Sequence, residues 1–199
     1  MTTIRFNFDD FLARSDLNAE ELYRVLDALP NYGWIAGGAV RRTLIGMSLD
    51  SDFDFFFRNE NELEKFEAEL PATLKLVRET VHHKHWRGVV EGSDLPIDVQ
   101  AIKFKWYDTA EDVIRSFDYT ITMFALDDSE LVTTPDALWD LGRKKLALNQ
   151  VTYPVATMRR MLKYTRQGFT ACAGCMADLF VRTATNPEAM AELDTEYVD

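Results

Sequence analysis

The sequence predicts an α+β fold in which helices flank a mixed sheet and the C-terminal part is helical. Three observations predict it. Apolar segments of strand length alternate with short helical patterns between residues 33 and 126, three such segments follow one another directly, and the pattern is helical from residue 154. The length of 199 residues suits one domain over residues 1–150 with a helical extension over 151–199.

The first expected helix covers residues 18–29, where leucine and valine recur at helical spacing and Pro30 ends the pattern. Three residues at or before its start can serve as caps: Ser15, Asp16 and Asn18. Residues 33–38 then predict a short buried strand that runs into a glycine turn.

A short helix is expected over residues 39–46, with Gly46 as its C-cap. The sequence DFDFFF at 52–57 has the length and alternation of a strand. A helix over 62–70 follows, stopped by Pro71.

Three alternating segments at 74–81, 85–90 and 95–102 predict an antiparallel meander. Residues 109–117 predict a short helix with Thr109 as N-cap, and 119–126 another strand.

Residues 135–148 are expected to form loop and turn, with a small strand at the end. The rest is predicted to be helical, over 155–169 and 171–185, followed by an acid-rich helix or tail. Two cysteines, Cys172 and Cys175, are expected to be reduced and packed on one helix face.

The formal net charge of −11 argues against a broad nucleic-acid-binding face, although a local basic patch is compatible with it. No apolar run reaches the roughly 20 residues that span a bilayer, and the N-terminus lacks the layout of a signal peptide. We therefore expect a cytoplasmic protein with no membrane partner.

The strand at 52–57 separates two kinds of side chain. Because residues i and i+2 share a face, Asp52 and Asp54 lie on one side while Phe53, Phe55 and Phe57 lie on the other. An unpaired buried carboxylate is very costly, and a divalent cation such as Mg²⁺ (or Mn²⁺) between the two would relieve their repulsion. The alternative is an exposed pair on an edge strand.

A third carboxylate strengthens the metal hypothesis. Asp98 interrupts the apolar segment 95–102, and it would join Asp52 and Asp54 if the two strands were neighbours. Three carboxylates can hold two metal ions, an arrangement used for nucleotidyl transfer. We expect these three side chains to converge near a glycine turn.

That turn is Gly37–Gly38, whose backbone N–H groups can approach an anion. Arg41 and Arg42, one turn further on, add positive charge. The short spacing from the glycines to the acids places phosphates and metals together.

These residues resemble a known family. The stretch GGAVRRTLIG…DSDFDFFF is similar to the head-domain signature of DNA polymerase beta-like nucleotidyltransferases, most closely the tRNA nucleotidyltransferase/poly(A) polymerase branch. The resemblance covers about residues 33–169. It implies that Gly37 and Gly38 contact the triphosphate of an NTP substrate, that Asp52 and Asp54 bind metal, and that Asp98 is the third carboxylate.

Weaker similarities lie downstream. EDVIRSFDYTITMFALD resembles the family's DLxRRDFTINAMAYD, which would place Asp118, Tyr119 and Thr120 near the ribose and sugar–phosphate of the nucleotide. TMRRMLKYTRQGF is similar to a family helix whose basic residues would be Arg159, Arg160 and Lys163. The resemblance favours a contact of these residues with nucleotide phosphate or RNA backbone, and a solvated helix face is the alternative. Ser116 and Phe117 stand where the family has paired arginines.

The sequence thus favours a metal-dependent enzyme that transfers NMP from an NTP to an acceptor hydroxyl. An RNA 3′ end is the favoured acceptor, and a protein or small molecule is the alternative. A nucleotide-sensing or antitoxin-type module without turnover is the competing hypothesis, suggested by the altered RRDFTIN-like segment. His83 and His85 share a strand face and are expected to be partly exposed, near the acceptor.

Overall fold

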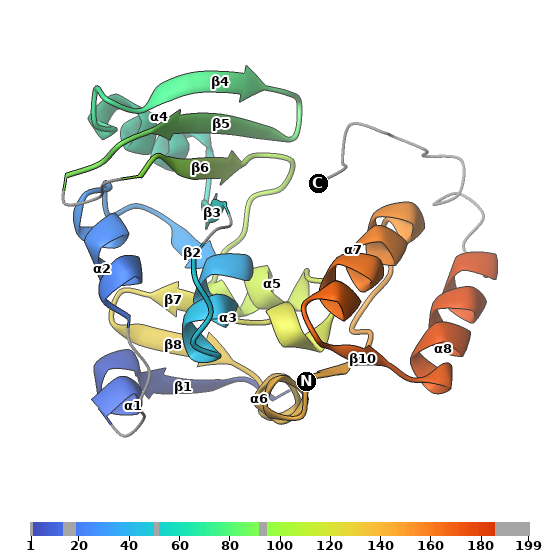
Figure 1. The fold of residues 1–199 in the computed structure, drawn as a ribbon. Helices are drawn as coiled ribbons and strands as arrows, with labels where there is room; N and C mark the ends of the chain where they lie inside the picture. The colour runs from blue at the N-terminus through green and yellow to red at the C-terminus, as the bar shows by residue number, and fades with distance from the viewer. Residues whose placement is uncertain (1, 14–18, 50–51, 92–94, 186–199) are drawn as a thin grey trace.

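The computed structural model describes residues 2–13, 19–49, 52–91 and 95–185, and within them an eight-stranded sheet (Figure 1). In chain order its strands are β1 (Ile4–Asn7), β2 (Trp34–Ala36), β3 (Phe53–Phe56), β4 (Lys75–Glu79), β5 (His83–Gly88), β6 (Ile97–Ile102), β7 (Ala125–Asp127) and β8 (Glu130–Thr133). Their spatial order is β1-β8-β7-β2-β3-β6-β5-β4. Only the β3–β6 pair is parallel within this sheet, so the predicted mixed sheet is confirmed.

Helices lie around this sheet and at the C-terminal end of the described chain (Figure 1). They are α1 (Phe8–Ala13), α2 (Glu20–Asp27), α3 (Gly38–Leu44), α4 (Glu60–Glu69), α5 (Ala110–Arg115), α6 (Pro135–Gly142), α7 (Pro154–Arg166) and α8 (Ala173–Ala184), with a 3₁₀ turn η1 (Thr120–Thr122). A second, parallel pair joins β9 (Lys145–Leu146) to β10 (Thr170–Ala171). The predicted α+β class is confirmed.

Strand β3 has the expected difference between its faces. Phe53 and Phe55 are buried, and Phe55 packs against Phe66 of α4 with ring centroids 4.9 Å apart. Phe57, just after the strand, packs on the same ring at 5.2 Å. The phenylalanine side is therefore anchored under α4, which leaves the opposite side for Asp54.

The antiparallel meander is confirmed, since β4 pairs with β5 and β5 with β6. The short helix α5 begins where predicted, because the Thr109 hydroxyl accepts a hydrogen bond from the Asp112 N–H. At the end of α3, Gly46 has a φ of +64°, as a glycine C-cap requires. The expected caps Ser15, Asp16 and Asn18 lie outside the described residues, as does the acid-rich tail.

The strand expected at 119–126 is wrong in its first half. The chain forms η1 there and becomes a strand only at Ala125. The threonine hydroxyls explain the difference, because Thr122 Oγ1 donates to the Tyr119 carbonyl at 2.8 Å and Thr120 Oγ1 donates to Asp140 at 2.8 Å. Such side-chain bonds favour a turn over a ladder.

The loop expected at 135–148 is also wrong, since its first part is α6, although the small strand at its end is confirmed as β9. Thr134 caps α6 by accepting from the Ala137 N–H at 3.1 Å, and Pro135 occupies the first turn. Threonine followed by proline is a helix-start signal that the sequence reasoning missed.

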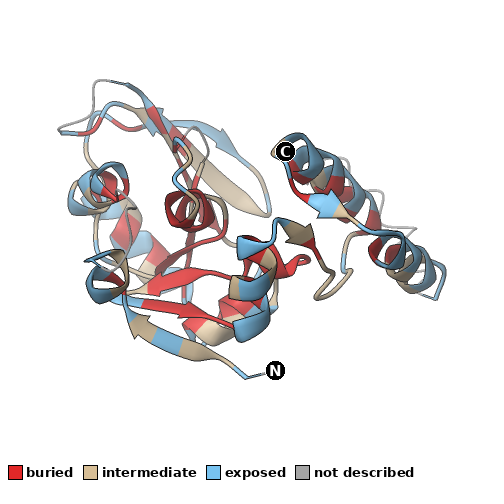
Figure 2. Ribbon diagram, turned by 60° about the horizontal axis from the view of Figure 1, so that its bottom comes forward, coloured by how far each residue is buried: buried red, intermediate tan, exposed pale blue. Residues whose placement is uncertain are grey.

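The buried residues form one core that runs from the central strands β2, β3 and β7 into α3 (Figure 2). Helices α7 and α8 lie side by side at one end, with exposed outer faces (Figures 1 and 2). The division at residue 150 stays a prediction. Of the cysteines, Cys175 is buried and Cys172 is exposed at the start of α8, so the expectation of two packed thiols holds for one only.

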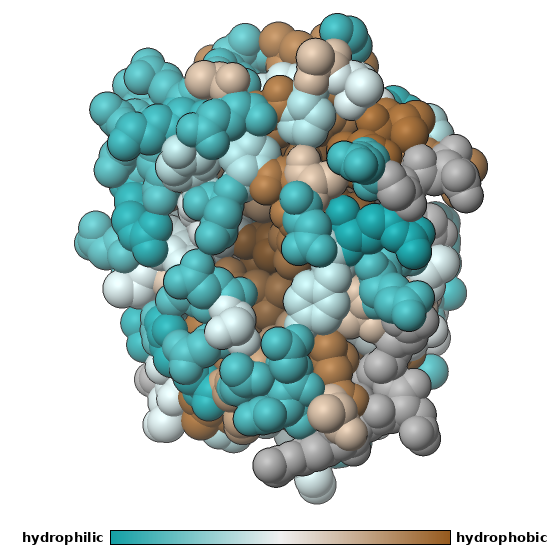
Figure 3. Space-filling view, turned by 90° about the vertical axis from the view of Figure 1, so that its left-hand side faces the viewer, coloured by the Kyte–Doolittle hydropathy of each residue, from teal (hydrophilic) through white to brown (hydrophobic). Residues whose placement is uncertain are grey.

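The face of the molecule near α1 and α2 is mostly hydrophilic, with apolar side chains gathered in a narrow hollow at its centre (Figure 3). No helix among the described residues is long and apolar enough to cross a membrane.

Candidate functional site

A cavity of about 500 Å³ lies on the aspartate side of β3. Its lining comes from the turn before α3, the face shared by β3, β5 and β6, the segment before η1, and α7. Eight of the predicted site residues line it: Gly37, Gly38, Arg41, Arg42, Asp52, Asp54, Asp118 and Lys163. Parts of the chain that are more than 100 residues apart thus meet at one surface.

The glycine turn follows β2 directly. Gly37 has a φ of +78°, which an L side chain rarely adopts, and its Cβ would lie 3.5 Å from the Phe117 ring. Its N–H donates to the Phe124 carbonyl at 2.9 Å. The sequence had suggested that the N–H groups of both glycines face an anion. The N–H of Gly37 instead holds the turn to the strand register.

Arg41 is almost wholly buried, with 1% exposure, and yet it lines the cavity. Its guanidinium lies 4.6 Å from the Tyr164 ring centroid, and its Nη2 donates to Gln167 Oε1 at 2.8 Å. Its Nε and Nη1 have no hydrogen-bond partner, and burial lowers the pKa of Arg41. Arg41 thus joins α3 to α7 and keeps donor capacity at the cavity.

Asp52 and Asp54 both line the cavity and are partly exposed. In the parallel register Asp54 lies opposite Gln100 of β6, and the Gln100 amide donates to Asp52. This glutamine was missed by sequence reasoning, although it shares the cavity face of β6 with Asp98, two residues earlier.

Asp98 shares that face but does not line the cavity. Its Oδ1 is 2.7 Å from His85 Nε2 and its Oδ2 is 3.5 Å from Arg87 Nη1, so β5 holds the carboxylate. Across the described residues, no three His, Cys, Asp or Glu side chains are grouped so that they could hold a metal ion. Of the three carboxylates expected to converge, Asp52 and Asp54 line the cavity and Asp98 does not, so the expectation is corrected for Asp98.

Asp118 is buried at the cavity wall, and its Oδ2 accepts from Arg160 Nη1 at 2.8 Å. Arg160, from α7, is itself a lining residue and belongs to the basic helix that the sequence pointed out. Thr120 is buried against Asp140 and does not line the cavity.

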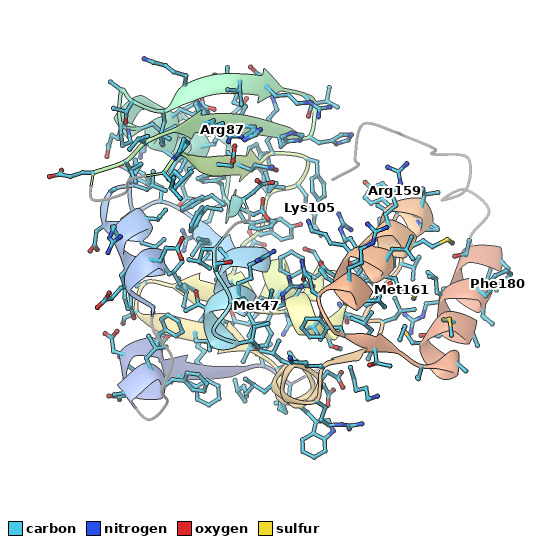
Figure 4. All side chains as sticks on the ribbon, in the orientation of Figure 1. Met47, Arg87, Lys105, Arg159, Met161 and Phe180 are labelled. Atoms are coloured by element: carbon cyan, nitrogen blue, oxygen red, sulfur yellow. The ribbon has the colours of Figure 1, made fainter. Side chains whose placement is uncertain are left out.

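Arg159 is exposed on α7 and is likewise absent from the lining (Figure 4). Lys105, labelled in the same view, lies between the sheet and α7 and does line the cavity. Neither Lys105 nor Arg78, another lining residue, was predicted from the sequence, because each comes from a segment without a recognisable motif.

The charge of the lining differs from that of the chain. Four arginines and two lysines line the cavity against three aspartates, whereas the whole chain carries −11. The described lining therefore combines a small acidic site with an excess of basic groups, which suits a polyanion that brings a cation. Burial also lowers the pKa of His83, so this lining histidine favours its neutral form.

Several solved structures of CCA-adding enzymes have a similar fold. The Thermotoga maritima CCA-adding enzyme complexed with tRNA matches with a TM-score of 0.60 and 19% identity, over 94% of this chain and 47% of that one. The Bacillus stearothermophilus CCA-adding enzyme in complex with CTP matches with a TM-score of 0.58 and 18% identity, over 84% and 44%. At these identities the likeness shows the fold alone.

The family comparison refines the expected branch. A family model described as Gabija anti-defense 2 family protein matches residues 3–144. Gabija anti-defense 2 of Bacillus phage SPbetaL7 is 30% identical over 154 residues, which are 76% of this chain and 36% of that protein. The chain thus spans little more than a third of that curated relative. It has a nucleotidyltransferase fold and belongs to the Gabija anti-defense 2 family rather than to a tRNA-type branch.

Proposed function

We propose that this chain transfers a nucleoside monophosphate from an NTP to an acceptor hydroxyl, and that the transfer counters a Gabija-type defence. One observation carries the proposal: Asp52 and Asp54 lie together on a cavity whose remaining charged side chains are mostly basic. The name of the phage relative supports the biological setting.

The two carboxylates fit a divalent cation. Carboxylate oxygens are hard ligands, and Mg²⁺ is commonly bound by one or two of them together with phosphate oxygens of the substrate. Asp52 and Asp54 would hold Mg²⁺ or Mn²⁺, which when bound neutralises phosphate charge and polarises the phosphoryl group.

The basic lining would seat the triphosphate. Arg41 offers the N–H groups of its guanidinium from a fixed position, because the aromatic ring of Tyr164 and the amide of Gln167 hold it. Lys163 and Arg160 approach from α7, and Arg160 is kept in place by Asp118. Fixed donors of this kind stabilise charge on a transferred phosphoryl group without reorganising during the reaction.

The acceptor to test first is an RNA 3′ end. Basic lining residues come from the sheet and the segment after it, Arg78 and Lys105, as well as from α3 and α7, so the cavity has basic groups to spare for phosphates of a second molecule. A protein hydroxyl is the other acceptor class to test.

A second candidate function is nucleotide binding without turnover. The specific observation in its favour is that Gln100, an amide, stands beside Asp54, while Asp98 is held by His85. An amide cannot act as a base in place of a carboxylate.

The experiment compares the protein with Asp54→Asn, using Asp136→Asn as the matched control because Asp136 is exposed on α6. Calorimetry measures binding of each NTP with Mg²⁺. Each α-³²P-labelled NTP is then incubated with total RNA and total protein from cells that carry a Gabija system.

We expect transfer of label that Asp54→Asn lowers by at least about 100-fold, since a metal site supplies several kcal/mol at the transition state. Asp136→Asn should transfer label like the wild type. Plaque counts on Gabija-carrying cells should likewise fall with Asp54→Asn and stay at the wild-type level with Asp136→Asn. Anti-defence that survives in Asp54→Asn, together with NTP binding but no transfer, would support the second candidate and reject the first.

A further inference from the structure

His85 and Asp98 form a dyad beside the proposed site. His85 Nε2 lies 2.7 Å from Asp98 Oδ1, and the two side chains are 21% and 23% exposed. His85 lines the cavity, whereas Asp98 does not and is also paired with Arg87 at 3.5 Å. The imidazole thus faces the cavity lining with a carboxylate fixed on one of its nitrogens.

The strand register places this histidine in one row with the acidic site. Asp54 lies opposite Gln100, Gln100 lies opposite His85, and His85 lies opposite Arg78 on β4. All four residues line the cavity. His85 is therefore two strand spacings from Asp54, about 10 Å between backbones, which leaves room for a phosphoryl group and an attacking hydroxyl.

The hydrogen bond to Asp98 decides which histidine nitrogen can accept a proton. A carboxylate only accepts, so Nε2 carries the hydrogen and Nδ1 keeps its lone pair. Gln100, between the histidine and Asp54, has no group that takes up a proton at neutral pH. His85 is the first side chain in the row beyond Asp54 that can serve as a base.

We propose that His85 is the general base of the nucleotidyl transfer, with Asp98 as its positioning residue; this rests on the proposed function. The acceptor oxygen attacks the α-phosphorus, and its proton passes to His85 Nδ1. The new O–Pα bond forms as the bond from Pα to the bridging oxygen breaks, and pyrophosphate leaves with that electron pair. The charged groups around the imidazole are Arg78 from β4, Asp98 from β6, and Arg87 on its own strand.

The test is chemical rescue. His85→Ala and Asp98→Asn are compared with His82→Ala, a neighbouring histidine outside the cavity lining, in the α-³²P-NTP assay with total RNA and total protein. We expect His85→Ala to lower transfer by about 100-fold or more, the range of general base catalysis, with the Kd for Mg²⁺–NTP unchanged within about twofold. Added imidazole should raise the transfer by His85→Ala at least about tenfold, because it can enter the space left by the ring.

Asp98→Asn should lower transfer by a smaller factor that imidazole does not restore, since the ring is still present but loses its fixed tautomer. His82→Ala should behave like the wild type. Transfer by His85→Ala within threefold of wild type, or a loss that imidazole leaves unchanged, overturns the dyad and leaves the proposed function standing. A wild-type protein that binds NTP but transfers no label overturns both.

Discussion

Gly33 controls how β2 meets the end of β3, and replacing it with alanine tests the packing that positions Asp54. Gly33 has a φ of +70°, and an added Cβ would lie 2.2 Å from the Phe56 carbonyl oxygen and 2.9 Å from the Phe57 ring. The left-handed backbone alone costs an L residue about 1–2 kcal/mol. Because the first obstacle is backbone, the strand must shift, which adds about 1–3 kcal/mol of overpacking strain.

Gly168 gives a matched control. Its φ is +90°, but nothing lies within 4 Å of the added Cβ, so Gly168→Ala carries only the backbone cost. Gly142 lies at the end of α6, also has open space around the added Cβ, and has no positive φ. Gly142→Ala should therefore raise the free energy of unfolding by about 0.4–1 kcal/mol. The three variants separate backbone strain from steric conflict.

The assay is urea unfolding followed by circular dichroism, with the free energy of unfolding compared at constant slope. We expect Gly33→Ala to lower the free energy of unfolding by about 1–3 kcal/mol more than Gly168→Ala does. Gly33→Ala should also weaken Mg²⁺–NTP binding, because the strand that carries Asp54 moves. Equal losses of stability in the two variants would refute the inference that the turn before β2 is closed against the backbone of β3.

Two further predictions concern the core and the cysteines. Phe66→Ala should lower the free energy of unfolding by about 3–5 kcal/mol, because Phe66 is fully buried. Phe180 is 78% exposed, so Phe180→Ala should change the free energy of unfolding by less than about 0.5 kcal/mol. Similar losses in the two variants would contradict the role assigned to α4. At pH 8, iodoacetamide should modify Cys172 well before Cys175, as followed by mass spectrometry. Hydrogen bonds from backbone N–H groups, chiefly that of Cys175, lower the pKa of Cys172, whereas burial raises the pKa of Cys175 to about 11. Equal rates would show that the packing around Cys175 opens readily.

Local sequence was sufficient for the faces of β3. The alternation of aspartate and phenylalanine placed Phe53 and Phe55 in the core and Asp52 and Asp54 toward the cavity, as the structure has them. Phe56 shows the limit of that reasoning: it lies on the aspartate side and is nevertheless buried, because the rings of residues 107 and 117 pack on it at 5.8 and 5.7 Å.

Helix starts and turns were predictable where a backbone signal stood alone, as at Thr109 and Gly46. They were missed where two signals competed. At 119–126 apolar alternation suggested a strand, but hydroxyl bonds to the backbone and to Asp140 favoured a turn. The partner Asp140 is 20 residues away, beyond what a local pattern can show.

The sequence by itself determined the alternation of β3 and the glycines that need positive φ, because both follow from single-residue geometry. Its motifs also indicated the nucleotidyltransferase fold that the structure has. Only the tertiary structure decided that Gln100, and not Asp98, stands beside Asp54, and that Asp98 belongs to His85. The reason is that strand register depends on packing and on turns between distant segments. A sequence pattern can therefore assign a carboxylate such as Asp98 to the correct face of a strand without showing which side chain it contacts.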